Sequence, residues 1–278
     1  METEAVCNVC PHRCRLKEGI RGLCRARICR DGVSVSENYG RITAIALDPI
    51  EKKPLKNFYP GSKILSVGSY GCNFRCPFCQ NYEIAWAGPD ESVYREISPE
   101  ELVRRAEGLK SYGNIGIAFT YNEPTIGYEY VLDTEKLAKE KGLKTVLVTN
   151  GCASSEIWDL LLPYTDALNI DLKGFSEKFY NMVSGSFETV KRNIIEADRK
   201  CHIELTTLII PGENDSFEDM REEAKWIASV DPEITLHVTR FFPRHLMTDR
   251  AATRASMPTT LGPTCSTSGA SMASSTAS

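Results

Sequence analysis

Apolar runs of strand length alternate with amphipathic runs of helical length through most of the chain. The strand candidates are 64–68, 115–120, 144–149, 167–171, 203–209 and 234–239. Some of the runs between them begin with clear helix signals, such as the serine, proline and two glutamates of 98–101. Repeated strand and helix alternation predicts a parallel sheet with crossover helices. We expect an α/β fold, and six such units in a curved sheet would make a partial (β/α)6 barrel.

Local signals predict where further elements begin and end. Ser155 and Ser216 each precede early acidic residues and are expected to open helices, and Gly142 lies where a C-terminal cap is needed after 135–141. Between residues 32 and 60 the pattern shortens to strand-like pieces at 32–35 and 41–47, and two prolines argue against a helix there. We predict a hairpin and a connector in this region.

The expected domain organisation has three parts. Residues 1–60 form a small cysteine-rich lobe with the connector, 61–250 form the partial barrel, and 251–278 form a low-complexity tail. From residue 254 onward the chain has no acidic residue and no lysine and is rich in Ser, Thr, Ala and Gly. Such a segment cannot bury enough apolar surface to offset the entropy of ordering, so we expect it to be disordered.

Three cysteines directly follow the first apolar run, within eight residues of one another. Cys72, Cys76 and Cys79 cannot all pair as disulfides, because their number is odd, so the loop indicates a metal centre. Three thiolates are one too few for a closed zinc site, and one too few for an iron–sulfur cubane with a cysteine on each iron. A cubane held by three cysteines leaves one iron open to a small molecule that carries an amine and a carboxylate.

The first thirty residues contain a second group of thiols, Cys7, Cys10, Cys14 and Cys24, with Cys29 close by. Their short spacings suit a small lobe that is held together by a metal, since the segment has few apolar residues. Zinc and an auxiliary iron–sulfur cluster both fit, and His12 could replace one thiol as a ligand. The alternative is a loop of reduced thiols.

Polar residues follow most of the predicted strands. In a barrel of this kind the functional groups gather at the C-terminal ends of the strands. Any one of these residues alone is most often a helix cap or a turn residue, but together they support a shared site. They are Asn122 and Glu123 after the second run, Thr149 and Asn150 at the end of the third, Asp171 and Lys173 after the fourth, and His245 after the sixth.

Composition narrows the class of protein. The chain has 278 residues, a net charge of -4 and 42% hydrophobic residues, which is typical of a globular protein and gives no overall basic bias toward nucleic acid. No run approaches the roughly 18 apolar residues of a membrane span, and the N-terminus lacks an export signal. We expect a cytoplasmic protein that binds neither membrane nor nucleic acid. In that compartment the eleven cysteines are metal ligands or free thiols.

The spacing Cys-x3-Cys-x2-Cys, with Phe78 before the third cysteine, resembles the signature of the radical S-adenosylmethionine (SAM) enzymes. The resemblance implies a [4Fe-4S] cluster on Cys72, Cys76 and Cys79 whose open iron chelates SAM. Reduction then cleaves SAM to methionine and a 5'-deoxyadenosyl radical, which abstracts hydrogen from a substrate. It also implies the partial barrel of that family and a low-potential electron donor such as flavodoxin or ferredoxin.

The same resemblance assigns roles to the residues after the strands. Glu123 would hold the SAM ammonium with Asn122 as its partner, although Tyr121 and Asn122 replace two glycines that are usual in the family. Thr149 and Asn150 would lie near the ribose. The motif of Asp171 and Lys173 is similar to one in glycyl-radical activating enzymes, where the lysine faces the SAM carboxylate. His245 corresponds to a SAM-contacting histidine. Thr206 and Thr207 stand where that group often has a basic residue.

A narrower resemblance rests on longer motifs. Residues 48–55, 58–62 and 72–81, together with the N-terminal thiols, resemble the AmmeMemoRadiSam system radical SAM enzymes over about residues 7–249. This implies Memo-like or AMMECR-like partner proteins and similarity to pyruvate formate-lyase activating enzymes. The family continues with a helix where this chain has its tail, so our hypothesis is a frameshift or truncation after 249–252.

Two functions from different classes follow. The first is an enzyme that cleaves SAM reductively and acts on an unidentified substrate, for example a glycine in a partner protein. The second is a metal-binding or metal-assembly protein without SAM turnover. We expect structural roles for His202 and His237, which lie within apolar runs, and for Cys152 and Cys201, which we interpret as small buried residues.

Overall fold

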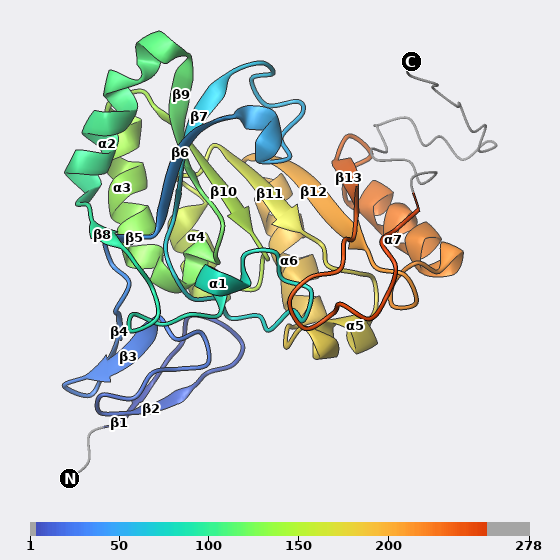
Figure 1. Cartoon of the computed structure of the whole chain (residues 1–278). Coiled ribbons are helices and arrows are strands. Elements are labelled where there is room, and N and C mark those ends of the chain that lie inside the picture. The colour runs from blue at the N-terminus through green and yellow to red at the C-terminus, as the bar shows by residue number, and fades with distance from the viewer. Residues whose placement is uncertain (1–3, 255–278) are drawn as a thin grey trace.

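A seven-stranded sheet forms the centre of the computed structural model, which describes residues 4–254 (Figure 1). The strands lie in the order β13, β12, β11, β10, β9, β7, β6. All neighbours pair in parallel except β6 and β7, which are antiparallel. The predicted α/β fold with six parallel strands is confirmed. The strands are β6 (Ala44–Pro49), β7 (Lys63–Gly68), β9 (Asn114–Phe119), β10 (Lys144–Thr149), β11 (Ala167–Asp171), β12 (His202–Ile209) and β13 (Thr235–Arg240).

Crossover helices connect the parallel strands and pack against the sheet, with α2 on β9, α3 on β9 and β10, and α6 on β12. The helices are α1 (Tyr82–Ala85), α2 (Pro99–Gly108), α3 (Tyr128–Glu140), α4 (Ser155–Leu161), α5 (Glu177–Met182), α6 (Phe187–Asp198) and α7 (Phe217–Val230). Three short 3-10 turns, η1 (Ile50–Lys52), η2 (Lys110–Tyr112) and η3 (Pro124–Gly127), lie in the connections.

The predicted helix signals mostly act as expected. Ser98 accepts a hydrogen bond from the amide of Glu101, and Ser216 accepts one from the amide of Glu218. Gly142 follows α3 with φ +64°, the left-handed conformation that favours glycine. Helix α4 begins at Ser155, as predicted, and Ser154 is its N-cap residue.

The predicted hairpin between residues 32 and 60 is wrong. Strand β4 (Val33–Ser36) pairs with β3 (Arg27–Arg30), and β5 (Arg41–Ile42) pairs with β8 (Arg95–Glu96). Strand β6 instead joins the main sheet beside β7. The apolar run that was interpreted as part of a hairpin therefore extends the central sheet. The small lobe also contains β1 (Glu4–Val6), which pairs with β2 (Arg15–Lys17).

The segment that follows β6 packs into the inner side of the sheet at the start of the strands. Ile50, Leu55 and Phe58 form one buried cluster with alanines and valine from β9, β10 and β11. The amides of Lys56 and Asn57 donate to the two carboxylate oxygens of Glu204 at 2.9 and 2.7 Å. This end of the curved sheet is thereby closed, which leaves the C-terminal ends of the strands for a cavity.

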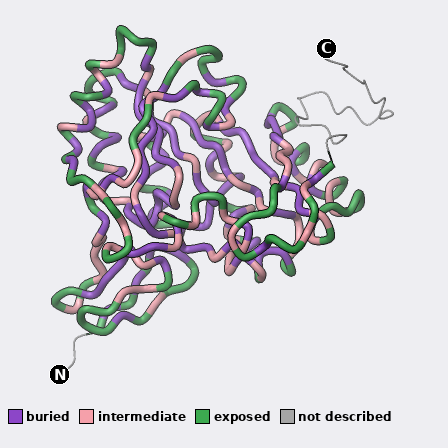
Figure 2. Tube along the Cα trace, in the orientation of Figure 1, coloured by how far each residue is buried: buried purple, intermediate pink, exposed green. Residues whose placement is uncertain are grey.

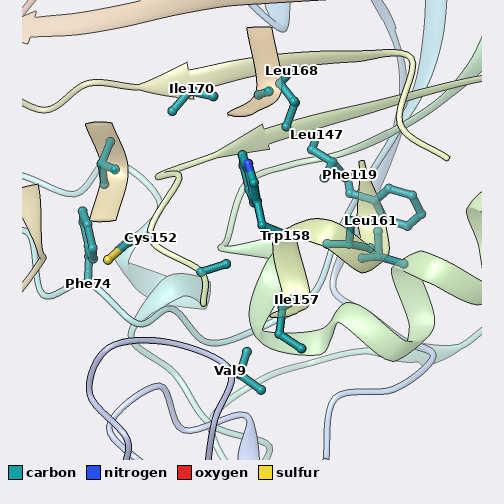
Figure 3. Packing of buried hydrophobic residues seen from close by; sticks show 14 of the residues in the cluster. Val9, Phe74, Phe119, Leu147, Cys152, Ile157, Trp158, Leu161, Leu168 and Ile170 are labelled. Atoms are coloured by element: carbon teal, nitrogen blue, oxygen red, sulfur yellow. The ribbon is translucent and has the colours of Figure 1, made fainter. Parts of the chain in front are cut away.

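Buried residues follow the strands and the inner faces of the helices, while exposed residues lie on the helix surfaces and loops (Figure 2). In the core Trp158 lies near Leu147, Leu161 and Phe119 (Figure 3). Val9 of the N-terminal lobe belongs to this cluster, so the lobe shares a core with the barrel.

The C-terminal tail was predicted to begin at residue 251. Thr253 is nevertheless buried, and its hydroxyl donates to the carbonyl of Ile209 and accepts from the amide of Phe241. The predicted disorder therefore does not apply to Thr253, and residues 255–278 lie outside the described residues. No helix within residues 4–254 is long and apolar enough to span a membrane.

Candidate functional site

A cavity of about 260 Å³ lies at the C-terminal ends of the parallel strands. It is lined by every residue that we placed at the main site from the sequence, except His245. Those residues are Cys72, Cys76, Phe78, Cys79, Asn122, Glu123, Thr149, Asn150, Asp171 and Lys173. Because parallel strands end at the same edge of a sheet, residues far apart in the chain meet here.

The cysteine loop forms one wall of this cavity. The amide of Phe74 donates to the sulfur of Cys72 at 3.3 Å, and every cysteine in the described part of the chain is unpaired. Burial raises the pKa of the Cys76 thiol to about 12. A bound metal centre would compensate for this burial, because metal coordination deprotonates thiols.

The donor set of the loop fits an iron–sulfur cluster. No three Cys, His, Asp or Glu side chains within residues 4–254 converge closely enough to hold a single metal ion. A cubane spreads its thiolate ligands around several irons and sulfides, so Cys72, Cys76 and Cys79 need not converge on a point. Their free thiols around one cavity suit the larger group.

Glu123 is the centre of a buried hydrogen-bond network beside the thiols. Its Oε1 accepts from the amide and hydroxyl of Thr125 at 3.0 and 2.6 Å, and from the hydroxyl of Thr149 at 2.7 Å. Its Oε2 accepts from the amide of Asn150 at 2.8 Å. Burial raises the pKa of Glu123, although these bonds oppose the shift. The carboxylate thus positions two neighbouring residues of the cavity wall.

Asn150 connects this network to the cysteine loop. Its side-chain amide donates to Oδ1 of Asn73 at 2.8 Å and approaches the sulfur of Cys72 at 3.7 Å. Asn122 makes a comparable link, because its Oδ1 accepts from the amide of Ser69 and its amide group donates to the carbonyl of Gly71. Both amides therefore hold the loop that carries the thiols.

Lys173 supplies the positive charge in the cavity wall. Its Nζ lies 2.8 Å from Oδ2 of Asp171. Burial opposes the charge of Lys173, yet the carboxylate of Asp171 outweighs this effect and raises the pKa of the lysine. The lysine is thus a cation at neutral pH, and it faces the cavity that the thiols line.

His245 lies outside the lining of this cavity, which differs from its predicted place. Its ring stacks on Tyr82 with 4.3 Å between the ring centroids and meets Trp86 edge-on. Its buried Nε2 has no hydrogen-bond partner among the described residues. The residue packs against the helix that follows the cysteine loop.

Several residues that line the cavity were not predicted from the sequence. Tyr121, Thr206, Leu208 and Thr239 also line the cavity. Thr206 and Leu208 share one side of β12, and this alternation was available from the strand pattern. The backbone of Tyr121 has φ +72°, a conformation that favours the glycine usual at this position in the family. The place of its side chain in the cavity wall became clear only from the structure.

The N-terminal thiols line a separate, much smaller cavity of about 10 Å³. Cys7, Cys10, Cys14 and Cys24 all border it, together with His12. The ring Nε2 of His12 lies 2.9 Å from the carbonyl oxygen of Asn73. Cys29 lies apart from this cavity, near the carboxylate of Glu18.

The residues expected to be structural have the following environments. His202 and His237 both contact the buried carboxylate of Glu204, at 3.0 and 2.5 Å. Cys152 is buried, as predicted, whereas Cys201 is only partly buried. His202 and His237 thus act as hydrogen-bond partners of Glu204 in the closed end of the barrel.

Comparison with known proteins gives a consistent picture. A family model described as the Radical SAM superfamily matches residues 66–224. An uncharacterized protein of Methanocaldococcus jannaschii is 39% identical over 245 residues, which are 87% of this chain and 72% of the relative. The pyruvate formate-lyase-activating enzyme of Clostridium pasteurianum is 26% identical over 165 residues, 58% of this chain and 67% of the relative.

Solved structures share the fold. The crystal structure of SuiB from Streptococcus suis superimposes with a TM-score of 0.52 at 14% identity. The match covers 65% of this chain and 40% of SuiB.

Proposed function

Because this chain belongs to the radical SAM superfamily, we propose that it is an enzyme that cleaves SAM reductively in the cavity at the strand ends. The observation that carries the proposal is the meeting of Cys72, Cys76 and Cys79 with Glu123 and Lys173 around that one cavity. These three thiolates would hold a [4Fe-4S] cluster. When bound, the cluster supplies an electron to SAM and so yields the 5'-deoxyadenosyl radical.

The amino acid part of SAM would lie between two charged residues. Lys173 would face its carboxylate, and the carboxylate of Glu123 would accept its ammonium. Oε1 of Glu123 has three protein donors, while Oε2 has one among the described residues, so Oε2 retains acceptor capacity. Thr149 and Asn150, which Glu123 positions, would lie near the ribose, and Phe78 would pack beside the cluster loop.

The substrate would occupy the side of the cavity that Thr206, Leu208 and Thr239 line. This wall presents hydroxyl and apolar groups. A neutral backbone segment suits it better than a strongly charged small molecule. We therefore propose hydrogen abstraction from a glycine in a partner protein, as the similarity to an activating enzyme suggests.

Several finer assignments belong to the same proposal. The electron donor would be a flavodoxin or ferredoxin, and the enzyme would act in the cytoplasm. Motifs in residues 48–55 and 58–62 favour the AmmeMemoRadiSam group, with Memo-like or AMMECR-like proteins as partners. A second metal would bind the N-terminal thiols Cys7, Cys10, Cys14 and Cys24.

Anaerobic reconstitution with iron and sulfide tests the main proposal. We expect absorbance at about 400 nm, typical of thiolate-ligated iron–sulfur centres, and release of 5'-deoxyadenosine when SAM and a reductant are added. Cys72→Ser, Cys76→Ser and Cys79→Ser should each abolish both signals, whereas the control Cys201→Ser should retain them. A colourless, zinc-loaded protein without nucleoside release would instead support the metal-binding alternative.

A further inference from the structure

The cavity between the N-terminal thiols has room for one small ion or one water molecule. Its volume of about 10 Å³ matches roughly one water-sized sphere. A cubane, with four irons and four sulfides, requires far more space. A single ion with four sulfur ligands in tetrahedral geometry is the arrangement that zinc favours.

Backbone groups lie close to two of these sulfurs. The backbone of His12 is next to the sulfur of Cys10, and the backbone of Ala26 and Arg27 is next to that of Cys24. The turn that contains Cys10 is closed by the amide of Cys7, which donates to the carbonyl of Cys14 at 2.9 Å. Amide donors stabilise a sulfur that carries negative charge, as a metal-bound thiolate does.

The lobe that carries the thiols shares a core with the barrel through Val9, but its own strands are short. Its strands β1, β2, β3 and β4 have three or four residues each and form two separate two-stranded sheets. Isolated two-stranded sheets are marginally stable in water. A bound metal is one of the devices that stabilise small folds of this kind.

The thiol cavity adjoins the loop of the catalytic cysteines. The amide of Cys72 donates to the carbonyl of Cys24 at 3.2 Å, and His12 contacts the carbonyl of Asn73. A Cβ added to Gly71 would lie 2.5 Å from the Cys24 carbonyl oxygen, so the two segments approach as closely as glycine permits. The position of Cys24 is thus coupled to the position of Cys72.

We propose that Cys7, Cys10, Cys14 and Cys24 bind one zinc ion that holds the cysteine loop of the main site in place. No three candidate ligands within residues 4–254 converge on a point in the structure, so the four side chains would have to rotate inward to reach one ion. The four thiols complete a tetrahedral site without His12, whose Nε2 contacts the carbonyl of Asn73. The zinc site is independent of SAM cleavage, while its bracing role rests on the proposed function.

Metal analysis of the full-length protein tests the zinc site directly. The protein is purified in air, where an exposed iron–sulfur cluster decays, and dialysed against a weak chelator. Because zinc has no redox chemistry, we expect about one zinc per chain to remain. Absence of zinc, or iron retained at these thiols in place of zinc, would overturn the proposal.

Two serine variants identify the ligands. Cys10→Ser should lose at least half of the bound zinc, whereas Cys29→Ser, which changes a buried cysteine of the same lobe outside the cavity, should retain it. Cobalt exchanged into the wild-type protein should give the visible bands of tetrahedral thiolate coordination, and Cys10→Ser should weaken them. Equal zinc in both variants would contradict the assignment.

Iron retention tests the bracing role. After identical anaerobic reconstitution, Cys10→Ser should hold several-fold less iron than Cys29→Ser and lose its absorbance faster in air. If Cys10→Ser loses zinc but retains iron like the wild type, the bracing role is wrong. If the wild type holds zinc and a cluster but releases no 5'-deoxyadenosine, the proposed function fails and the zinc assignment stands.

Discussion

The phenol oxygen of Tyr121 lies 2.9 Å from Oδ2 of Asp48, which joins the cavity wall to the edge strand β6. The Nζ of Lys53 lies 2.9 Å from the same oxygen and 4.8 Å from the centre of the Tyr121 ring. Burial opposes the charge of Asp48, but the hydrogen bonds from Lys53 and Tyr121 outweigh it and hold its pKa at about 2. Asp48 and Lys53 form a buried ion pair with an additional hydrogen bond.

Removal of Lys53 should therefore destabilise the fold strongly. Lys53→Met leaves the Asp48 carboxylate buried without its main partner, and we expect a loss of about 3 kcal/mol in the free energy of unfolding. Lys52→Met is the matched control, since Lys52 approaches the other Asp48 oxygen from an exposed position. Its loss should lie below about 1 kcal/mol. Urea unfolding measures both, and equal losses would contradict this account of the pair.

Glu123→Gln should damage both stability and SAM binding. A glutamine has only one acceptor oxygen, so at least one of the buried donors that reach Glu123 loses its partner. We expect a loss of roughly 1–3 kcal/mol in unfolding free energy and a weaker affinity for SAM. Thr125→Val removes only the hydroxyl donor and should have a smaller effect on both. Denaturation and SAM titration of the reconstituted protein compare the two variants. Larger losses in Thr125→Val than in Glu123→Gln would contradict this role of the carboxylate.

Lys173→Met should reduce SAM affinity with little change in stability. The ammonium of Lys173 would bind the SAM carboxylate by a charge-assisted hydrogen bond, and loss of such a bond weakens binding by about 10-fold to 100-fold. Lys178→Met changes an exposed lysine of α5 and should bind SAM normally. Calorimetric titration of SAM into anaerobic protein compares the two. Unchanged affinity in Lys173→Met would remove the lysine from the SAM site.

The pH dependence of stability should report on Glu135, a buried residue of α3. Burial raises its pKa to about 8, and only its Oε1 has a described partner, the hydroxyl of Thr165 at 3.0 Å. Between the usual value of 4.5 and about 8 the folded state binds one more proton than the unfolded state. The free energy of unfolding must therefore fall as pH rises through this window.

Glu135→Gln should abolish that part of the pH dependence. Between pH 5 and pH 8, the free energy of unfolding of the wild type should fall by on the order of 3 kcal/mol more than that of the variant. Glu140→Gln changes an exposed carboxyl near the end of the same helix, and its unfolding curve should follow that of the wild type. Urea unfolding at both pH values provides the test, and parallel pH profiles for wild type and Glu135→Gln would contradict the raised pKa.

The parallel strands, the cap at Ser98 and the clustering of most site residues could be predicted from the sequence alone. Strand and cap signals act through the backbone and near neighbours, so they can be read locally. The site residues were predictable because each follows a parallel strand, and all such ends lie at one edge. The cysteine spacing indicated a metal centre for the same local reason, and its resemblance to the radical SAM signature implied a [4Fe-4S] cluster.

Contacts between residues far apart in the chain could not be predicted without the fold. Tyr121 and Asp48 are 73 residues apart, and Lys56 and Glu204 are 148 residues apart. We predicted a hairpin in place of the pairing of β6 with β7, because that pairing depends on the path of the connector between these strands. His245 likewise packs on Tyr82, since the loop after β13 reaches α1. Such contacts depend on packing between elements, which no local pattern of side chains contains.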